Sequence, residues 1–567
     1  MMSAYWPATA PQVRRAMTLQ DANPASATYG CCDRTFWQYR TISSFAAATM
    51  QQLALPFAVL CTTSFTGNEW YGSNQMLDRA ASAMLFWSRL PHRCGAVDEW
   101  YRHEHSYCAT AFTTYGISEA LLLLETRLEP AQRDSVLRAL TRAGDWLSTR
   151  FNDRVMNQNL AACAALWNLH TCTGAARYKT AFASVWRRTL ANQDEEGWFT
   201  EYGGADLGYS LLALDLLAAL DRRGFSEARA AASRLSRFVA SFAVGYGDLA
   251  GRLGSRGTAH VFPFGAEALA ASTPDAGRIA AHLRASAAAA AIAGPAAADD
   301  RYLAYFYLPS FVLASAIEPA VAVPREAAHD AQWPNSGFRV WTRAGSSIVC
   351  SARRAAAFAV HGGSCAAHRN LGYWAETEDG RFASCPWRPD KEPVDLGDAS
   401  AIRAEGRFAR VDDELPLVRH ETAFRMLAAW LFRWCAVAEL WHRALKRRMT
   451  RRATAPLRFT RELRWERDSL LVRDVIARIE QGPALRTITP VDDIEIHSPS
   501  ARLDGGSKVE SIRVPREDAE RWASEVNRAG RLTLVTTYAI DAGGRIRFEG
   551  IRMESADITS QGELERR

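Results

Sequence analysis

The sequence predicts an α+β multidomain fold, in which an N-terminal (α/α) helical toroid is followed by an antiparallel β-sandwich. Apolar residues recur with helical spacing from about residue 45 to Ile317. After Pro334 the pattern changes to short runs rich in β-branched and aromatic residues. A chain of 567 residues is long enough for two or more domains. We therefore assign 1–44 to an N-terminal extension, 45–325 to the toroid and 326–567 to the β-sandwich.

About ten helices of similar length are expected in the toroid. Their apolar stripes are Met76–Leu90, Thr110–Leu124, Ala131–Leu147, Leu160–His170, Tyr178–Leu190, Leu211–Leu220, Ala228–Phe242, Gly265–Ala271, Ile279–Ile292 and Leu303–Ile317. Pro91, Pro130, Gly174 and Gly224 stand at the breaks, as is typical of helix ends. Short and long loops alternate between the stripes. This alternation indicates helical hairpins closed into a ring, with the long loops gathered on one face where they build a cleft.

Strands are expected after a domain boundary between Glu318 and Trp333. The β-rich runs are Phe338–Thr342, Ser347–Ser351, Ala356–Val360, Leu471–Ile476, Leu532–Tyr538 and Arg545–Glu549. Glycine-containing turns separate several of them, which favours an all-β sandwich.

A helical, basic insertion interrupts the strands at about 421–455. Phe424–Trp441 places Trp430, Trp434 and Trp441 on one apolar face, and the basic run Lys446–Arg452 follows at once. Such a helix suits peripheral contact with the anionic surface of an inner membrane through residues 424–452. The alternative is a helix packed over the sandwich or the toroid.

Charge, cysteines and the N-terminus exclude several classes of protein. The net charge is +6, and the segment from Arg443 to Arg467 contains ten Lys or Arg residues but only two acidic residues. No nucleic-acid motif accompanies this run, so no nucleic-acid partner is expected.

Eleven cysteines without metal-ligand spacing indicate reduced, buried thiols. No signal peptide is apparent, so we expect a cytoplasmic protein. His103 and His105 do not match the helical His-Glu-x-x-His pattern, so neither a metal nor a cofactor is expected.

The segment Asp194–Tyr209 concentrates aromatic, acidic and glycine residues between two apolar helices. A plain connection would be short and polar. Aromatic rings beside carboxylates suit a carbohydrate, because sugar rings present flat C–H faces and outward hydroxyls. The alternative is that Trp198 and Phe199 plug the end of a helical barrel. Gln193–Trp198 also resembles the glutamine–glycine–tryptophan turn of helical toroids, which is a structural signal.

Four places resemble the heparinase II/III-like polysaccharide lyases, which combine a helical toroid with a β-sandwich. Asn157 opens Asn157–Leu166 as the family's asparagine opens a barrel helix, although Gln158 stands where the family often has His. Glu195–Tyr209 is similar to the family's acidic loop ending in tyrosine. Gly254–His260 is similar to an arginine-bearing loop. In His361–Tyr373, His368 and Asn370 match part of the family's His-x-His-x-Asp motif.

The resemblance implies a lyase that acts on a uronic-acid-containing polysaccharide, with Tyr209, His368, Asn157 and Arg256 as catalytic residues. Residues that would contact the acidic polysaccharide are Trp198, Glu201, Tyr202, Asp206, His260, His105 and Asn370. The protein would then work beside capsule or exopolysaccharide production. Two alternatives stay open: a uronyl C5-epimerase, and a non-catalytic glycan-binding or scaffold protein of polysaccharide assembly.

The chemistry can also be argued from the residues. The C5 proton of a uronate is weakly acidic while its carboxylate is ionised, and an amide with a cation stabilises the developing enolate. Asn157 and Arg256 supply these groups. A phenol beside a cation can transfer the proton, which is the role expected of Tyr209, while His368 would act on the other sugar face. Structural alternatives are a helix N-cap for Asn157, an ion pair with Asp206 or Glu267 for Arg256, and a satisfied loop histidine for His368.

Overall fold

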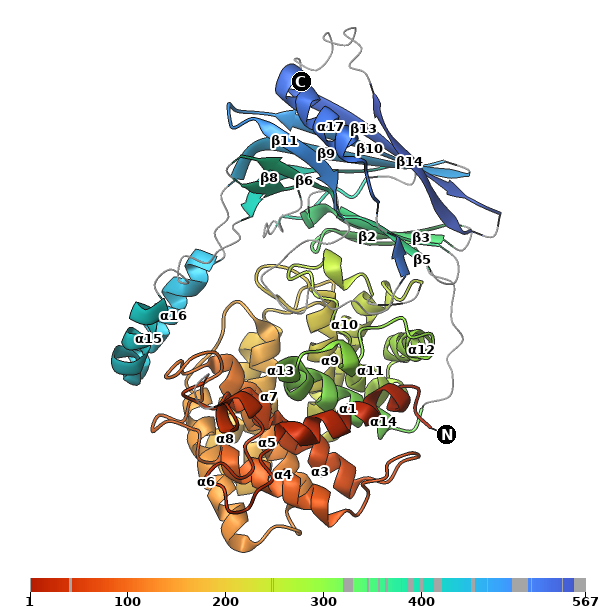
Figure 1. The fold of residues 1–567 in the computed structure, drawn as a ribbon. Helices are drawn as coiled ribbons and strands as arrows, with labels where there is room; N and C mark the ends of the chain where they lie inside the picture. Colours follow the sequence, from red (N-terminus) through yellow and green to blue (C-terminus); the bar gives the residue numbers. More distant parts are fainter. Residues whose placement is uncertain are drawn as a thin grey trace.

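The computed structural model describes residues 2–39, 43–245, 247, 249–319, 330–343, 346–354, 357–362, 366–378, 380–384, 392–397, 401–411, 421–449, 454–466, 468–491, 508–510, 512–542 and 544–554. Helices occupy the chain as far as Ser315, and strands begin at Ala331. Figure 1 shows the helical region on one side of the molecule and the sheets on the other. The predicted order of a helical toroid followed by an antiparallel β-sandwich is confirmed.

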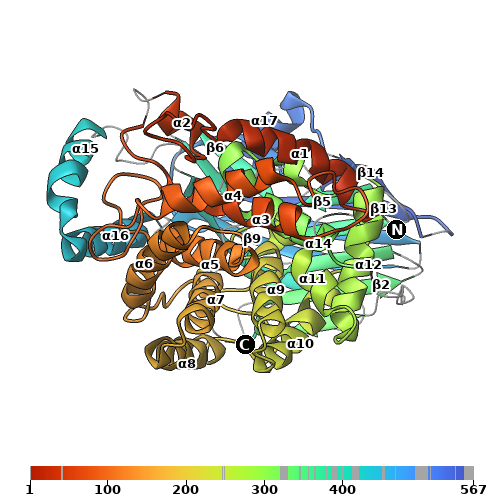
Figure 2. The same ribbon diagram turned by 90° about the horizontal axis from the view of Figure 1, so that it is seen from below.

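Six helices form the inner ring of the helical region, each packed against the next, with the last packed on the first. They are α3 (Ala54–Thr62), α5 (Tyr107–Leu124), α7 (Met156–Thr173), α9 (Leu207–Arg222), α11 (Phe264–Leu269) and α14 (Leu308–Ser315). Five outer helices each pack against the inner helix that precedes them (Figure 2). They are α4 (Asn74–Trp87), α6 (Pro130–Leu147), α8 (Ala176–Leu190), α10 (Glu227–Ala240) and α12 (Pro274–Ala288).

The sequence explains which helices lie inside the ring. Inner helices α5, α7 and α9 are apolar on nearly all sides, and most of their residues are buried. Outer helices α8 and α10 are amphipathic and keep a charged face in solvent. Helix α1 (Trp6–Leu19) packs on α14 and buries Trp6, Val13 and Leu19. Part of the segment assigned to an N-terminal extension therefore belongs to the helical core.

The strands form two sheets. The first has the order β1-β2-β3-β4-β5-β12, and the second has the order β11-β6-β7-β8-β9-β10-β13-β14. Their bounds are β1 (Ala331–Trp333), β2 (Phe338–Arg343), β3 (Ser346–Ser351), β4 (Ala357–Gly362), β5 (Ala366–Asn370), β6 (Tyr373–Thr377), β7 (Arg381–Ala383), β8 (Ala401–Val411), β9 (Thr454–Trp465), β10 (Ser469–Arg478), β11 (Leu485–Pro490), β12 (Lys508–Glu510), β13 (Arg531–Ile540) and β14 (Ile546–Glu554). Neighbouring strands are antiparallel except β5 and β12, which run parallel.

The six-stranded sheet lies between the helical ring and the eight-stranded sheet (Figure 1). On one face it meets α10, where the rings of Phe338 and Phe238 lie 6.3 Å apart. On the other face Trp341 and Phe358 pack against the second sheet. Helix α17 (Arg516–Ala529) packs against β11 and β13 of the second sheet. The first sheet is therefore the sheet that faces the helical ring.

The basic run after residue 443 divides between two environments. Within it, Arg461 lies on β9 and is fully buried, pairing with Asp474 through Nε–Oδ1 at 2.6 Å. The neighbouring Arg458 and Arg464 point outward, because side chains alternate along a strand. Only part of this positive charge is therefore available to a partner.

The insertion differs from the single helix that was predicted. It is a hairpin of α15 (Glu421–Trp430) and α16 (Cys435–Met449), joined by a 3₁₀ turn over Leu431–Arg433. The break turns Phe432 inward, where it is buried among Tyr101, Phe424 and Trp441. Trp430 and Trp434 are 66% and 57% exposed. Hereafter we call α15, α16 and their turn the insertion hairpin.

Two expectations from composition can be compared with the structure. The nine described cysteines are all free. The apolar run Phe45–Cys61 ends in α3, which is buried in the helical ring. Among the residues that the structure describes, no helix combines the length and apolarity needed to cross a membrane.

Candidate functional site

The loop that precedes α9 is held in place by two neighbouring segments. Glu201 forms an isolated bridge with Val155, at the start of α7. Ser255 donates from its backbone N–H to the carbonyl of Ala205, and from its hydroxyl to the carbonyl of Glu201 at 2.7 Å. Three segments that are distant in sequence, at 155–157, 201–209 and 254–260, thus meet at one end of the ring. We call their meeting place the candidate site.

One carboxylate, Asp206, organises the candidate site. It caps α9, where Oδ1 accepts from the backbone N–H of Tyr209 at 3.1 Å. The same oxygen accepts from the Thr258 hydroxyl at 2.6 Å, and Oδ2 accepts from the backbone N–H of Arg256 at 2.9 Å. Burial raises the pKa of Asp206, and these hydrogen bonds oppose the rise. Asp206 therefore positions Tyr209 and Arg256 rather than standing free for a ligand.

Gly254 is required by the close approach of the two loops. A Cβ atom at this position would lie 2.9 Å from the Asp206 Cα and 2.8 Å from its Oδ2. Any side chain would push Asp206 away from the Arg256 loop.

Tyr209 and Arg256 form the charged and titratable part of the site. The Arg256 guanidinium lies over the Tyr202 ring, 4.2 Å from its centroid. Burial acts to lower the pKa of Arg256, but Tyr202, Tyr209 and Asp206 raise it above its usual value, so the cation persists. Burial raises the pKa of the Tyr209 hydroxyl well above its usual range, and Arg256 offsets part of that rise. Tyr209 is therefore a neutral phenol at neutral pH.

His260 lies beneath Tyr209 and is fully buried. Their rings meet edge to face with centroids 5.6 Å apart, and Tyr302 stacks on the imidazole with centroids 5.4 Å apart. Nδ1 of His260 lies 3.0 Å from the Tyr307 hydroxyl. Burial, assisted by Arg256, lowers the pKa of His260 to about 3. The imidazole is therefore neutral, and it supports the Tyr209 ring.

Asn157 and Glu201 form a second polar pair in the candidate site. Asn157 lies in the first turn of α7, whose N-cap is Val155, so the N-cap alternative does not apply to it. Its backbone N–H donates to Glu201 Oε1 at 2.9 Å. Burial raises the pKa of Glu201 to about 8, against the opposing hydrogen bonds from Asn157. Oε2 of Glu201 is buried and has no hydrogen-bond partner among the described residues.

Trp198 lies at the junction between the helical ring and the first sheet. Its indole N–H donates to Glu196 Oε2 at 2.9 Å. Glu196 also accepts from the backbone N–H groups of Asn335 at 2.6 Å and Ser336 at 2.9 Å. With 8% of its surface exposed, Trp198 offers little ring area to a sugar. Gln193 completes the turn by donating to the carbonyls of Gly197 and Ala231.

His105 is also buried, in a different group of side chains. Its Nε2 lies 3.1 Å from the backbone carbonyl of Phe432 in the insertion hairpin, and its Nδ1 lies 3.3 Å from Cys94 Sγ. His105 thus contacts the hairpin, and none of its hydrogen bonds reaches Tyr209 or Arg256.

His368 and Asn370 lie on β5, and their side chains fall outside the described part of the chain. The backbone of His368 pairs with Val360 on β4 and with Glu510 on β12. Strand β4 contacts the 3₁₀ turn Gly251–Leu253, immediately before the Arg256 loop. The first sheet therefore contacts the helical ring next to the Arg256 loop, and the catalytic role of His368 stays a prediction.

Several contributors to the site were not identified from the sequence. Thr258, Tyr302 and Tyr307 lie against Asp206 or His260. Arg354, from the β-region, donates to the carbonyl of Gly254. The glycine spacing in Gly251–Gly257 could have drawn attention to a tight loop there. No local signal marks Arg354, because its partner is 100 residues away.

No protein-family model matches the sequence, and no curated protein matches it. One solved structure that it resembles is the Streptomyces coelicolor A3 chondroitin AC lyase in complex with chondroitin sulphate. The two chains are 10% identical and superpose with a TM-score of 0.45 over 86% of this chain and 67% of that chain.

Proposed function

We propose that this protein is a polysaccharide lyase that acts on a uronic-acid-containing polysaccharide by C5 proton abstraction and β-elimination. The observation that carries the proposal is the pairing of Tyr209 with Arg256 through Asp206. The backbones that carry a phenol and a persistent cation are thereby joined, near the Asn157–Glu201 pair, and Arg256 acts electrostatically on the Tyr209 hydroxyl. We expect the catalytic geometry to depend on all four residues.

The substrate carboxylate would be bound by Arg256, Asn157 and Glu201. The positive charge of Arg256 offsets the negative charge that develops when the C5 proton leaves. At neutral pH Glu201 is largely protonated, so its unpartnered carboxyl oxygen can donate to a substrate carboxylate without repelling it. These contacts would become stronger as the enolate forms. Interactions that are stronger in the transition state than in the ground state lower the activation barrier of the elimination.

Tyr209 would move the proton. Its neutral phenol is suited to protonating the glycosidic oxygen as the 4-O-linked sugar departs. To abstract the C5 proton it must first lose its own, and Arg256 is the neighbour that lowers its pKa in that direction. In elimination, the C5–H bond breaks, its electron pair forms the C4–C5 double bond, and the C4–O bond breaks. His368 is proposed to serve on the opposite sugar face.

Placement beside capsule or exopolysaccharide production is part of the same proposal. The insertion hairpin exposes Met426, Trp430, Trp434 and Leu440, each more than half exposed. Exposed indoles next to a basic segment favour contact with an anionic membrane interface. The protein would then act at the cytoplasmic face of the membrane where such a polymer is made.

The proposal is tested with the full chain and a panel of polyuronates. A lyase releases unsaturated uronate, which absorbs in the ultraviolet, and the signal should be lost in Tyr209→Phe but kept in Tyr71→Phe, an exposed tyrosine outside the site. Solvent deuterium entering C5 without chain cleavage would instead identify an epimerase. Saturable binding with neither outcome would identify a glycan-binding scaffold.

A further inference from the structure

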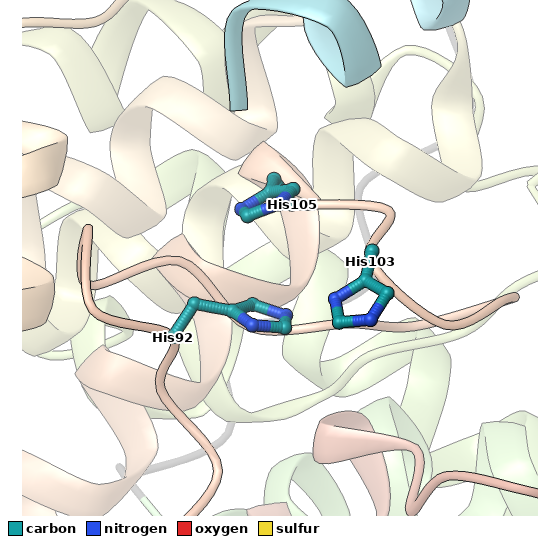
Figure 3. A group of neighbouring side chains, drawn as sticks. All are labelled: His92, His103 and His105. Atoms are coloured by element: carbon teal, nitrogen blue, oxygen red, sulfur yellow. The ribbon is translucent and has the colours of Figure 1, made fainter. Parts of the chain in front are cut away.

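Three histidines from two loop segments meet beside the insertion hairpin. Figure 3 shows the imidazoles of His92, His103 and His105 gathered together. One nitrogen from each ring lies within 4.8 Å of the others. The ring of His92 has centroid distances of 4.5 Å to His105 and 5.2 Å to His103. We propose that this histidine cluster binds a divalent transition-metal ion of the zinc class.

The hydrogen bonds around the cluster leave donor atoms free for a metal. His92 Nε2 lies 2.9 Å from Asp98 Oδ1, and His105 Nε2 lies 3.1 Å from the Phe432 carbonyl. Metal-binding histidines usually direct one ring N–H to a carboxylate or a backbone carbonyl, which fixes the tautomer and presents the other nitrogen. Nδ1 of His92 is presented in this way, whereas Nδ1 of His105 lies 3.3 Å from Cys94 Sγ and would exchange this weak contact for the metal.

His103 supplies the most direct indication of a ligand. Both of its ring nitrogens are buried, and neither has a hydrogen-bond partner among the described residues. A neutral imidazole has one N–H donor and one acceptor nitrogen, and buried polar groups are normally paired. An imidazole in this position therefore indicates a bound ion or water. A metal ion between the three rings would satisfy it.

Asp98 preorganises all three ligands. Besides holding His92, its Oδ1 accepts from the backbone N–H of His105 at 3.1 Å, and its Oδ2 accepts from that of His103 at 2.8 Å. His103 and His105 both adopt left-handed backbone conformations, with φ of 61° and 53°. Such conformations are costly for residues other than glycine, and they are found where surrounding structure imposes them.

The donor set indicates the class of ion. Imidazole nitrogens suit zinc, copper, iron and nickel, whereas calcium and magnesium prefer oxygen ligands. Three histidines with a fourth position open to water is a common zinc arrangement. In a tetrahedral site with bonds of about 2.0–2.1 Å, donors lie about 3.3–3.4 Å apart, so small ring rotations complete the geometry.

A metal here would also strengthen the docking of the insertion hairpin. His105 is bonded to the Phe432 carbonyl, and another polar link between the hairpin and the ring is the ion pair of Arg150 with Glu439 at 2.8 Å. Fixing the His105 ring fixes the acceptor on the hairpin. Cys94 and Cys435 also lie beside His105 and form a second, softer donor group with it. The test must separate these two groups.

The experiment titrates the chelator-treated full chain with Zn²⁺, and in parallel with Co²⁺, whose visible absorption reports four-coordinate binding. One equivalent should bind the native protein. His103→Asn keeps a residue that tolerates left-handed backbone and should weaken binding at least 100-fold. Asp98→Asn should weaken it about 10–100-fold through lost ligand orientation. His170→Asn, a histidine on α7 outside the cluster, should leave binding unchanged.

Two outcomes would overturn the proposal. One is the absence of stoichiometric binding of either ion. The other is a metal lost from the Cys94→Ser/Cys435→Ser double variant but kept by His103→Asn, which would move the site to the thiols. A second readout is independent of activity: removal of the metal should increase proteolytic cleavage within 421–449, and Zn²⁺ should reverse this in the native protein but not in His103→Asn.

Discussion

The guanidinium of Arg354 donates from Nε to the carbonyl oxygen of Gly254 at 3.0 Å, and its Nη2 bonds the same oxygen. Arg354 follows β3 in the first sheet, whereas Gly254 lies two residues before Arg256 in the helical ring. Both residues are buried. The β-region thus holds the loop that carries the cation of the candidate site.

Replacing Arg354 with Met should reduce activity without unfolding the protein. The substitution removes both guanidinium hydrogen bonds to the Gly254 carbonyl, which keeps only its bond from the Gly257 N–H, at a cost of about 1–3 kcal/mol. A shift of about 1 Å in the Arg256 loop can reduce turnover by about 10²-fold. Thermal unfolding and turnover on a confirmed substrate measure the two effects. Arg353→Met is the matched control, because Arg353 bonds the Asn335 and Glu392 carbonyls instead. Equal activity loss in both variants would contradict a specific role for Arg354.

Tyr209→Phe should remove proton transfer while preserving packing. The ring supplies most of the burial, so the thermal midpoint should change little. Proton transfer by a positioned side chain contributes roughly 10²–10⁴-fold, so turnover should fall by that factor with little change in KM. A rise in KM that accounts for the whole loss would make Tyr209 a substrate-binding platform instead.

The pH profile should rise toward alkaline pH and depend on Arg256. If Tyr209 abstracts the proton, its active form is the phenolate, whose population grows as pH approaches the raised pKa. Arg256 lowers that pKa, so Arg256→Met should move the alkaline limb to higher pH as well as reducing turnover. The backbone N–H bond to Asp206 survives this substitution, so the loop should keep its position. An unmoved limb in Arg256→Met would assign the titration to another group.

Glu201 should make stability decline with rising pH. Its pKa is raised to about 8 in the folded state, so its contribution is fully present below its unfolded pKa and is lost as pH rises through about 8. One such proton changes stability by about 1.4 kcal/mol per pH unit within this window. Glu201→Gln removes this titrating proton, so the thermal midpoint should depend less steeply on pH in the variant than in the native protein.

Glu104 offers a matched comparison for that measurement. It is buried, its pKa is also raised to about 8, and it lies in the His103–His105 loop. Glu104→Gln should flatten the pH dependence of stability in the same way but leave turnover unchanged. Loss of turnover in both variants would indicate that the effect of Glu201 on activity acts through stability.

Membrane contact should depend on the exposed indoles of the insertion hairpin. Trp430→Ser/Trp434→Ser should reduce flotation with anionic liposomes, and added salt should weaken the binding of the native protein. Folding should be unaffected, because both rings face solvent. Tyr71→Ser, at an exposed aromatic residue outside the hairpin, controls for general loss of surface apolarity. The proposal would be contradicted if flotation were the same with neutral and anionic lipids and were unchanged in Trp430→Ser/Trp434→Ser.

The helical and β-rich regions could be predicted because their signals are local. Apolar spacing in Thr110–Leu124 and Leu211–Leu220 identified helices that the structure places in the inner ring. Strand runs such as Leu532–Tyr538 were equally clear. Helix α17 was missed among the strands, and the insertion hairpin was predicted as one helix. The break in the insertion hairpin at Leu431–Arg433 places Phe432 against Tyr101. Tyr101 is distant in sequence, so no local pattern predicts this contact.

The sequence by itself determined which residue types were available to the candidate site: a tyrosine at the start of α9, an arginine in a glycine-rich loop and an asparagine at the start of α7. Only the tertiary structure decided that Asp206 joins two of these loops, that Arg354 holds one of them from the β-region, and that His92 meets His103 and His105. It also decided the charge states, since burial raises the pKa of Glu201 and Tyr209. Periodicity depends on near neighbours in the chain, whereas burial depends on atoms contributed by segments far away in sequence.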